Sequence, residues 1–295
     1  MTNRRDAFDA YDSFEVVSIC DICGKDAAAI VDRNASVLQC RNCGFRFVSP
    51  RPTQAAIARS YSRPQQYEAW LEASVERDRL WRRRFAQVAG GLTPGRLLDV
   101  GAGLGTFLAV AREHGWIVRG TEVSKSAIDY ARSTYGIDLT EGQLEEFVPD
   151  GPFDLITLWH VLEHVPSPSW ALRKCRDLLA PGGRLVVACP NDSAANEAIA
   201  KVGRAARALL RRRETPRYSR LTPGVETHVS HFTPTTITRL MTNSGFTIQS
   251  IDVDDAAPVR SRVGSATFKA RRFLTHATGV HLNREMVLIA CRAGP

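Results

Sequence analysis

The sequence has no long apolar run. No stretch approaches the roughly 18 consecutive apolar residues that a membrane-spanning helix needs. Residues 1–9 carry mixed charge without the apolar centre of a secretory signal, and neither an internal repeat nor a low-complexity tract is visible. An apolar fraction of 44% and a charged fraction of 24% are typical of globular domains. We therefore expect a globular, cytoplasmic protein.

Cysteine is scarce, and its placement is uneven. The total of seven is odd, which argues against a disulfide framework. Four of the seven form two pairs with two residues inside each pair, namely Cys20 with Cys23 and Cys40 with Cys43. Two such pairs are typical of a zinc site with four thiolate ligands. Four thiolates leave no open coordination position, so we expect a structural Zn²⁺ that holds a small module together.

Proline and glycine divide the chain into four expected regions. These are a lead-in over 1–17, a zinc ribbon over 18–50, a helical linker over 51–93 and a large domain over 94–295. In the linker, Thr53 is suited to cap a helix that continues to about Ser60. A longer helix is expected from Gln65 to Ala89, where apolar residues recur at helical spacing.

The large domain alternates strands with helices, which favours a mostly parallel sheet covered on both faces. Expected strands lie near 96–100, 117–122, 137–140, 153–159, 184–189, 246–253 and 285–291. Helices are expected over 128–135 and 169–179. A further helix is expected to open at Pro234 and to end at Gly245.

The most informative segment begins with an apolar strand that ends in Asp99. A turn with Gly101, Gly103 and Gly105 follows, and a helical pattern starts directly after it. Glycine leaves backbone N–H groups uncovered at the start of that helix, where a nucleotide-like ligand can approach. About 20 residues further on, a second strand ends in Glu122, which is the position of a ribose-binding carboxylate.

In these motifs the chain resembles the class I S-adenosylmethionine-dependent methyltransferases. The resemblance covers roughly 94–250, and it rests on segments 98–105, 121–124, 153–168 and 178–187. It implies an α/β, Rossmann-like fold whose seven-stranded, mostly parallel sheet has helices on both faces and an antiparallel terminal hairpin. The zinc ribbon and the helical linker precede that domain.

The resemblance also implies which residues bind S-adenosylmethionine. The backbone of the three glycines would lie against the cofactor, Asp99 would reach its ammonium group, and Glu122 would accept both ribose hydroxyls. Val123 would pack on the adenine, whose edge would meet Gln143 and Leu144. Many relatives have an acid where this chain has Gln143. Trp159 and His160 would line the methionine end.

The segment from His160 to His164 permits several interpretations. Its residues match the His-x-x-Glu-His motif of the inverted zinc proteases. In those proteases the motif lies on a helix, whereas here it directly follows an apolar strand, which argues against a protease. It also resembles, in part, a methyltransferase subgroup that holds a divalent ion with Glu-x-x-Glu-His. Whether a divalent metal binds at His160, Glu163 and His164 therefore stays an open question. The leading interpretation has Glu163 and His164 supporting the cofactor loop.

A second histidine cluster, with His228 and His231, precedes the helix that Pro234 opens. Methyl transfer to a hydroxyl needs in-line approach and the removal of one proton, for which a histidine with a pKa near 6.5 is suited. We predict His231 or His160 as the base, with His228 third. The alternative is that His231 only bonds backbone beside the helix.

A basic insertion near 192–220 is the last distinctive feature. Lys201 to Arg220 holds eight basic residues and one acid, and it supplies most of the net charge of +8. As an amphipathic helix it could form a lid, grip an anionic or lipid-linked substrate, or rest peripherally on the anionic inner membrane face. Nucleic acid is a weaker alternative.

The preferred hypothesis is a methyltransferase that acts on a hydroxyl of a sugar, a glycolipid or a related secondary metabolite. The alternative is a ribosomal RNA base methyltransferase whose zinc ribbon binds RNA, which the basic pI of about 9.4 would suit. Against that alternative, the residues after the fourth strand lack the Asn-Pro-Pro-aromatic type of segment with which methyltransferases that act on amino groups stack a base. A third hypothesis is a zinc-organised binding module that has lost turnover.

Overall fold

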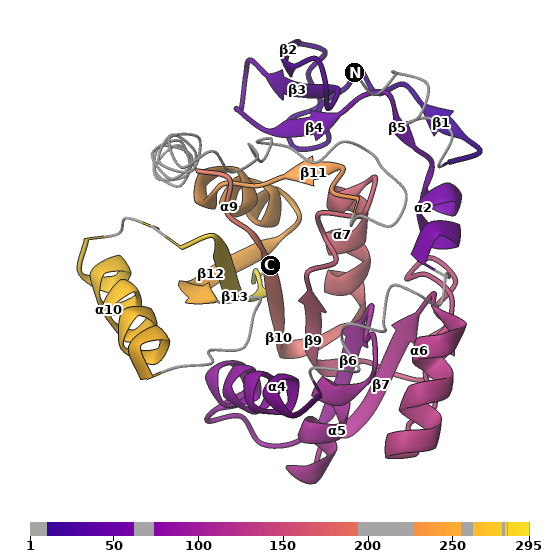
Figure 1. The fold of residues 1–295 in the computed structure, drawn as a ribbon, viewed down its shortest axis with the longest axis vertical. Helices are drawn as coiled ribbons and strands as arrows, with labels where there is room; N and C mark the ends of the chain where they lie inside the picture. Colours follow the sequence, from indigo (N-terminus) through magenta and orange to yellow (C-terminus); the bar gives the residue numbers. More distant parts are fainter. Residues whose placement is uncertain are drawn as a thin grey trace, which may run out of the picture.

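The computed structural model describes residues 11–61, 74–193, 227–254, 262–278, 281 and 283–294. A seven-stranded sheet forms its centre, and a smaller four-stranded sheet lies at one end, with three of its strands in indigo to purple at the top of Figure 1. Most of the basic insertion, residues 194–226, lies outside the described residues, as does the start of the predicted helix 65–89.

The central sheet has the order β12-β13-β10-β9-β6-β7-β8. Its strands are β6 (Arg96–Val100), β7 (Ile117–Glu122), β8 (Thr140–Glu141), β9 (Phe153–Trp159), β10 (Leu179–Pro190), β12 (Phe246–Asp254) and β13 (Glu285–Arg292). Neighbouring pairs among β6 to β10 are parallel, whereas β13 is antiparallel to both β10 and β12. The predicted seven-stranded, mostly parallel sheet is confirmed.

Helices cover both faces of this sheet (Figure 1). They are α4 (Ser74–Ala89), α5 (Thr106–Glu113), α6 (Lys125–Tyr130), α7 (Pro168–Leu178), α9 (Pro234–Asn243) and α10 (Arg262–Thr278), with a π-helical turn at Ala131–Tyr135. The central strands are buried on both sides, since neighbouring residues such as Leu97 and Leu98 have no exposed area. Leu97 belongs to the core under α4 and α5, and Leu98 to the core under α7 and α9.

The cysteine-rich module is continuous with the larger domain. Its sheet has the order β11-β4-β3-β2, with strands β2 (Ala28–Asp32), β3 (Val37–Cys40), β4 (Arg46–Val48) and β11 (Ser230–His231). Strand β11 comes from the distant segment before α9, yet it pairs antiparallel with β4. Beside it, the rings of Phe45 and Phe232 stack at 5.5 Å between centroids. The two regions therefore share one sheet and one core.

Two short strands and a helix connect this module to the larger domain. They are β1 (Phe14–Glu15), β5 (Arg51–Pro52) and α2 (Gln54–Tyr61). As predicted, Thr53 caps α2, because its Oγ1 accepts a hydrogen bond from the Ala56 backbone N–H at 3.3 Å. Thr233 caps α9 with a reciprocal capping box formed with Thr236.

Several boundaries differ from the sequence-based expectations. The third strand lies at Thr140–Glu141 rather than 137–140, because the side chains of Ile137 and Leu139 are buried in the core without joining the ladder. Strand β10 begins at Leu179, ahead of the predicted 184. Helix α10 was not predicted. Within the described residues, no helix combines the length and the hydropathy needed to cross a bilayer.

Candidate active site

The glycine turn between β6 and α5 forms a cradle that only glycine can build. Gly101, Gly103 and Gly105 have φ values of 67°, 54° and 73°, in the left-handed region that side chains disfavour. A Cβ on Gly101 would lie 2.7 Å from the Val161 Cγ2, and one on Gly105 would lie 2.9 Å from the Ala131 Cβ. Space and backbone conformation therefore both require glycine here.

Glu122 lies at the end of β7, facing this turn. Its Oε2 accepts a hydrogen bond from the Gly103 N–H at 2.8 Å, and its Oε1 accepts from the N–H groups of Val123 and Ser124 at 2.9 Å each. Only 4% of the residue is exposed. These three donors hold the carboxylate in one orientation beside the glycines, where its remaining lone pairs suit the hydroxyls of a ribose.

Asp99 closes the floor of the cradle at the end of β6. Its carboxyl is buried, and the Thr157 hydroxyl donates a hydrogen bond to its Oδ1 at 2.6 Å. Burial raises the pKa of Asp99 to about 7; the Thr157 hydrogen bond opposes this rise and the charge of Glu122 adds to it. A cation placed beside Asp99 would therefore favour loss of its proton.

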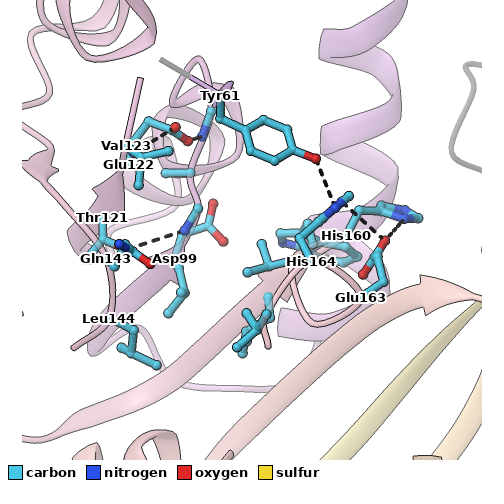
Figure 2. A pocket seen from close by; sticks show the side chains of 18 of the residues that line it. Tyr61, Asp99, Thr121, Glu122, Val123, Gln143, Leu144, His160, Glu163 and His164 are labelled. Atoms are coloured by element: carbon cyan, nitrogen blue, oxygen red, sulfur yellow. Dashed lines mark hydrogen bonds and ion pairs between the residues drawn. The ribbon is translucent and has the colours of Figure 1, made fainter. Parts of the chain in front are cut away.

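A cavity of about 620 Å³ runs from this cradle to a charged region beyond the end of β9 (Figure 2). Its volume is in the range of small-molecule sites. Ten of the predicted site residues line it: Asp99, Gly101, Gly103, Glu122, Val123, Gln143, Leu144, Trp159, His160 and His228. Gly105 is not among the described lining residues and supports the cradle from behind. The structure thus brings most of the predicted residues together.

The far end of the cavity holds a buried ion pair between Arg84 of α4 and Asp254 of β12. The Arg84 Nε lies 3.3 Å from the Asp254 Oδ1, and a second contact joins the Arg84 Nη2 to the other carboxylate oxygen. The Arg84 guanidinium also lies 4.8 Å from the ring centroid of Trp159. This pair fixes the helix, the last strands and the Trp159 ring relative to one another.

His160 lies among three carboxylates in this region. Its Nδ1 is 3.5 Å from the Glu163 Oε1 and 3.6 Å from the Glu285 Oε2, and its Nε2 is 3.8 Å from the Asp254 Oδ2. Burial on its own lowers the pKa of His160, but Asp254 and Glu163 outweigh burial and raise it to about 10. The Arg84 Nη2, 3.1 Å from the His160 Nε2, opposes that rise.

Glu285, at the start of β13, is the partner of His160 that titrates near neutrality. Burial raises its pKa to about 7, although the charge of His160 opposes the shift. Its side chain is 20% exposed and lines the cavity. A carboxyl with this pKa can accept a proton at neutral pH.

Glu163 and His164 follow His160 on the loop after β9, and His228 comes from the segment before β11. One ligand atom from each of Glu163, His164 and His228 lies within 4.8 Å of the others. His160 has a φ of 55°, which is unusual for a residue with a side chain and turns this loop sharply. In Figure 2, Tyr61 of α2 points toward His164, and Glu163 lies beside the same histidine.

The four predicted zinc ligands form a separate cluster. The Sγ atoms of Cys20 and Cys43 lie 3.5 Å apart, and those of Cys23 and Cys40 lie 3.6 Å apart. Thiolates placed tetrahedrally around one Zn²⁺ at 2.3 Å would lie about 3.8 Å apart. Within each pair, Gly24 or Gly44 donates its N–H to the first cysteine's carbonyl. The arrangement therefore fits a zinc ribbon.

His231 has a different environment from the other two predicted bases. It lies in β11 with 8% of its surface exposed, and its Nδ1 is 3.0 Å from the Asp192 Oδ2. The described lining of the cavity does not include it. The structure therefore brings His160 and His228 to the cavity and places His231 in the sheet of the cysteine module.

The polar lining residues that the sequence analysis missed include Tyr61, Arg84 and Glu285. In the sequence, Arg84 is one of several arginines on an expected helix, and no pattern distinguishes it from the others. Its partner Asp254 lies 170 residues further along the chain. Glu285 opens the last strand, and that position gave only a weak signal. Only the expectation that the last strand is antiparallel to its neighbour, which puts its first residue at the edge of the sheet where the parallel strands end, could have suggested it.

Comparisons with known proteins agree with this geometry. A family model described as a methyltransferase domain matches residues 74–251, more than half of the chain. Among curated proteins, the ubiquinone biosynthesis O-methyltransferase of Pasteurella multocida is 36% identical over 115 residues, covering 34% of this chain and 48% of that protein. The Caulobacter enzyme of the same name is 34% identical over 130 residues, covering 41% and 52%. The chain thus spans about half the length of these relatives.

Among solved structures, a chain of the complex between the Haloferax volcanii Trm112 methyltransferase activator and a methyltransferase superposes with a TM-score of 0.53. The match covers 78% of this chain and 97% of the other at 13% identity, which supports the fold. Together with the family match and the sheet order, it leads to one conclusion. The chain belongs to the methyltransferase-domain family and has the fold of the class I S-adenosylmethionine-dependent methyltransferases.

Proposed function

We propose that this protein transfers the methyl group of S-adenosylmethionine to a hydroxyl of a small-molecule acceptor. The observation that carries the proposal is the single cavity that joins the glycine cradle and Glu122 to the region of His160 and Glu285. A cofactor and a small acceptor can meet inside it. The name O-methyltransferase of the curated relatives supports an oxygen acceptor. A sugar, a glycolipid or a related secondary metabolite is our proposed acceptor class.

The residues of the cradle have proposed roles that follow from their chemistry. Glu122 binds the ribose hydroxyls, Asp99 faces the ammonium group, and Val123, Gln143 and Leu144 surround the adenine. S-adenosylmethionine, when bound, supplies an electrophilic methyl group on a sulfonium. Trp159 is our proposed contact for the methionine end, and its ring centroid lies 4.8 Å from the Arg84 guanidinium.

The residues at the other end would orient the acceptor and take its proton. In the reaction the C–S bond breaks with its electrons left on sulfur, a C–O bond forms, and the hydroxyl proton leaves. We propose that the pair of Glu285 and His160, 3.6 Å apart, receives this proton. His228 lies within the same cavity as a further polar contact for the acceptor. For His231 we propose a positioning role through Asp192 and β11.

We further propose that the four cysteines bind one structural Zn²⁺. The sulfur spacing suits a tetrahedral site, and four thiolates complete it without an open position for substrate. Its role would be to hold β2, β3 and β4 and, through them, β11. Several expectations rest only on composition and on the insertion near 192–220, and they stay predictions. These are cytoplasmic placement, a lipid-linked or anionic acceptor, a peripheral membrane contact of the insertion and the RNA alternative.

The proposal is tested by incubating the purified protein with isotopically labelled S-adenosylmethionine and extracts of metabolites and lipids. We expect a small molecule that carries one labelled methyl group with the parent protein and with Glu141→Ala. Glu141 is exposed at the end of β8 and is a matched control for Glu122. The Glu122→Ala variant should give much less product. Label that appears only in RNA, or equal label with Glu122→Ala, would contradict the proposal.

A further inference from the structure

We propose that the outward face of α10 is a docking surface for an anionic lipid bilayer. Helix α10 spans Arg262–Thr278 and links β12 to β13, the last two strands of the central sheet. None of its described residues lines the cavity, so the surface does not depend on the proposed function. It is also separate in sequence from the basic insertion near 192–220.

The first support is the way in which α10 packs on the larger domain. Phe268 and Thr275, two turns apart on one face of the helix, are buried. The Arg83 guanidinium of α4 lies 4.6 Å from the Phe268 ring centroid. Beside this face, the Arg272 Nη2 forms an ion pair with the Asp252 Oδ2 of β12 at 2.7 Å. These contacts attach α10 by one face, so its opposite face is turned outward.

The second support is the composition of that outward face. At about 100° per residue, four described side chains point away from Phe268 and Thr275. These four, the outer stripe, are all apolar and exposed: Ala270, Phe273, Leu274 and Ala277. Phe273 is 72% exposed, more than any other aromatic side chain in the described part of the chain. Large apolar side chains that adjoin one another on the surface indicate an interaction site.

The third support is the charge beside the outer stripe. None of the 17 residues of α10 is acidic. Lys269 and Arg271 are exposed, one on each side of the stripe. The Arg271 Nη1 lies 3.3 Å from the side-chain oxygen of Asn283, a neutral partner that leaves the positive charge in place. An apolar stripe between basic residues is the pattern of a helix that lies in the interface of a membrane.

Two other occupants fit this surface less well. A second copy of the chain would bring one basic helix against another, because α10 has no acid that could pair with its own basic residues. Four side chains also cover much less than the roughly 800 Å² that each partner of a stable dimer buries. The backbone of a nucleic acid duplex would contact the basic residues but leave Phe273 and Leu274 exposed. An anionic bilayer uses both features, since its headgroups attract the basic residues and its acyl chains accept the apolar ones.

The fourth support is the place of α10 in the molecule. Strand β12 is an edge strand of the central sheet, and Figure 1 shows α10, in yellow, at the periphery beside β12. After the helix, the Asn283 side-chain amide donates to the Asp254 carbonyl at 3.0 Å. Asp254 in turn pairs with Arg84, which lines the cavity. A bilayer bound at α10 would therefore lie close to the acceptor end of the cavity.

The test is co-sedimentation of the full-length protein with vesicles of phosphatidylcholine and phosphatidylglycerol in equal parts, and with vesicles of phosphatidylcholine alone. We expect the parent protein to bind the anionic vesicles, and to bind the neutral ones roughly tenfold more weakly or not at all. Added salt should weaken the binding to anionic vesicles.

Variants locate the contact on α10. The double variant Phe273→Ser, Leu274→Ser should bind anionic vesicles roughly tenfold more weakly, and Lys269→Glu should weaken binding several-fold. Val148→Ser is the matched apolar control, because Val148 is 85% exposed in the loop after β8. Lys125→Glu is the matched charge control, because Lys125 is exposed at the start of α6. Both controls should bind as the parent does.

Parent protein that does not bind anionic vesicles would overturn the proposal, and so would RNA binding without vesicle binding. Equal binding by the parent and the double variant would place the contact elsewhere on the chain and contradict it too. A dimer of the parent that the double variant loses in sedimentation velocity, without vesicles, would assign the stripe to a second copy instead. Circular dichroism and S-adenosylmethionine calorimetry should match the parent for every variant, because the changed side chains are exposed and lie outside the cavity lining.

Discussion

Among the described residues, two clusters have side chains that could hold a metal ion, and the clusters differ in how they are assembled. The four cysteines come from two short knuckles beside the small sheet, where Cys40 ends β3, and all four candidate ligand atoms are sulfur. Glu163, His164 and His228 come from segments more than sixty residues apart, and they line the substrate-sized cavity. The first cluster is closed and suits a structural role. The second is open toward the cavity and suits chemistry.

The clusters are nevertheless linked through β11. This strand completes the sheet of the cysteine module, and the residues just before it carry His228. The backbone of Val48 donates a hydrogen bond to the Val229 carbonyl at 3.0 Å, directly beside His228. The cysteine module therefore holds a wall of the cavity, although it contributes no cysteine to the described lining.

Removal of zinc from the cysteine site should have the largest effect. The apparent binding free energy of a structural zinc in small modules is about 10–16 kcal/mol. Without the ion we expect β4 and β11 to separate, so that methyl transfer is lost. Cys40→Ser should act in the same way. Methyl transfer by zinc-free protein, measured after chelation and elemental analysis, would contradict the proposed link between the cysteine module and the cavity.

Glu163→Gln sharpens the comparison, because it should remove the negative charge of the second cluster without unfolding the protein. Its Tm should stay close to that of the parent, whereas zinc removal lowers the Tm strongly. Thermal unfolding of both samples is the measurement. A collapse of the Glu163→Gln variant would show that this cluster is structural too.

Arg84→Met should give the next largest effect. Asp254 would lose its closest partner and keep the Arg83 Nη2 at 3.6 Å and the His160 Nε2 at 3.8 Å, so the cost should be somewhat below the roughly 3–5 kcal/mol of a fully unpaired buried charge. Denaturant unfolding should show this loss. Arg82→Met is the matched control, because Arg82 is on the same helix in exposed ion pairs and its loss should change stability little. Equal effects would contradict the structural role assigned to the Arg84 pair.

The pH dependence of cofactor binding should follow Asp99. Its pKa is about 7 in the cofactor-free protein, so the carboxyl holds a proton at pH 6 and loses it by pH 8. A bound ammonium group favours the charged form, so affinity should rise about tenfold over this range and binding should release a proton below pH 7. Calorimetry in buffers of different ionisation enthalpy measures both. The Asp99→Asn variant should lose this dependence.

Asp21→Ala should have the smallest effect of these changes. Asp21 lies in the first cysteine knuckle, and its carboxylate accepts hydrogen bonds from the Ser169 N–H at 2.7 Å and the Ser167 hydroxyl at 3.0 Å. It thereby caps α7 from a distant part of the chain. Loss of a helix cap costs about 1 kcal/mol. A change in thermal stability well above that value would mean that Asp21 does more than cap α7.

The sequence predicted those features that depend on local patterns. The glycine turn, Glu122 and the two cysteine knuckles each occupy a few neighbouring residues, so spacing alone indicated their roles. The strands were found because central parallel strands are apolar on both faces, as Leu97 and Leu98 show.

The parts that could not be predicted depend on tertiary contacts. Arg84 pairs with Asp254 across 170 residues, and Glu285 meets His160 only because β13 lies beside β10. The pairing of β11 with β4 also joins segments far apart in sequence. No spacing pattern encodes such pairs, which is why the environment of His231 and the cluster around Glu163 required the structure.

The most direct test of this account is a calorimetric titration of S-adenosylmethionine into the parent protein, Glu122→Ala and Glu141→Ala. Charge-assisted hydrogen bonds to the ribose are worth about 1.5–3 kcal/mol, so Glu122→Ala should bind roughly 10- to 100-fold more weakly. Glu141→Ala should bind like the parent. Equal affinity for all three proteins would contradict the cofactor site on which the proposed function depends.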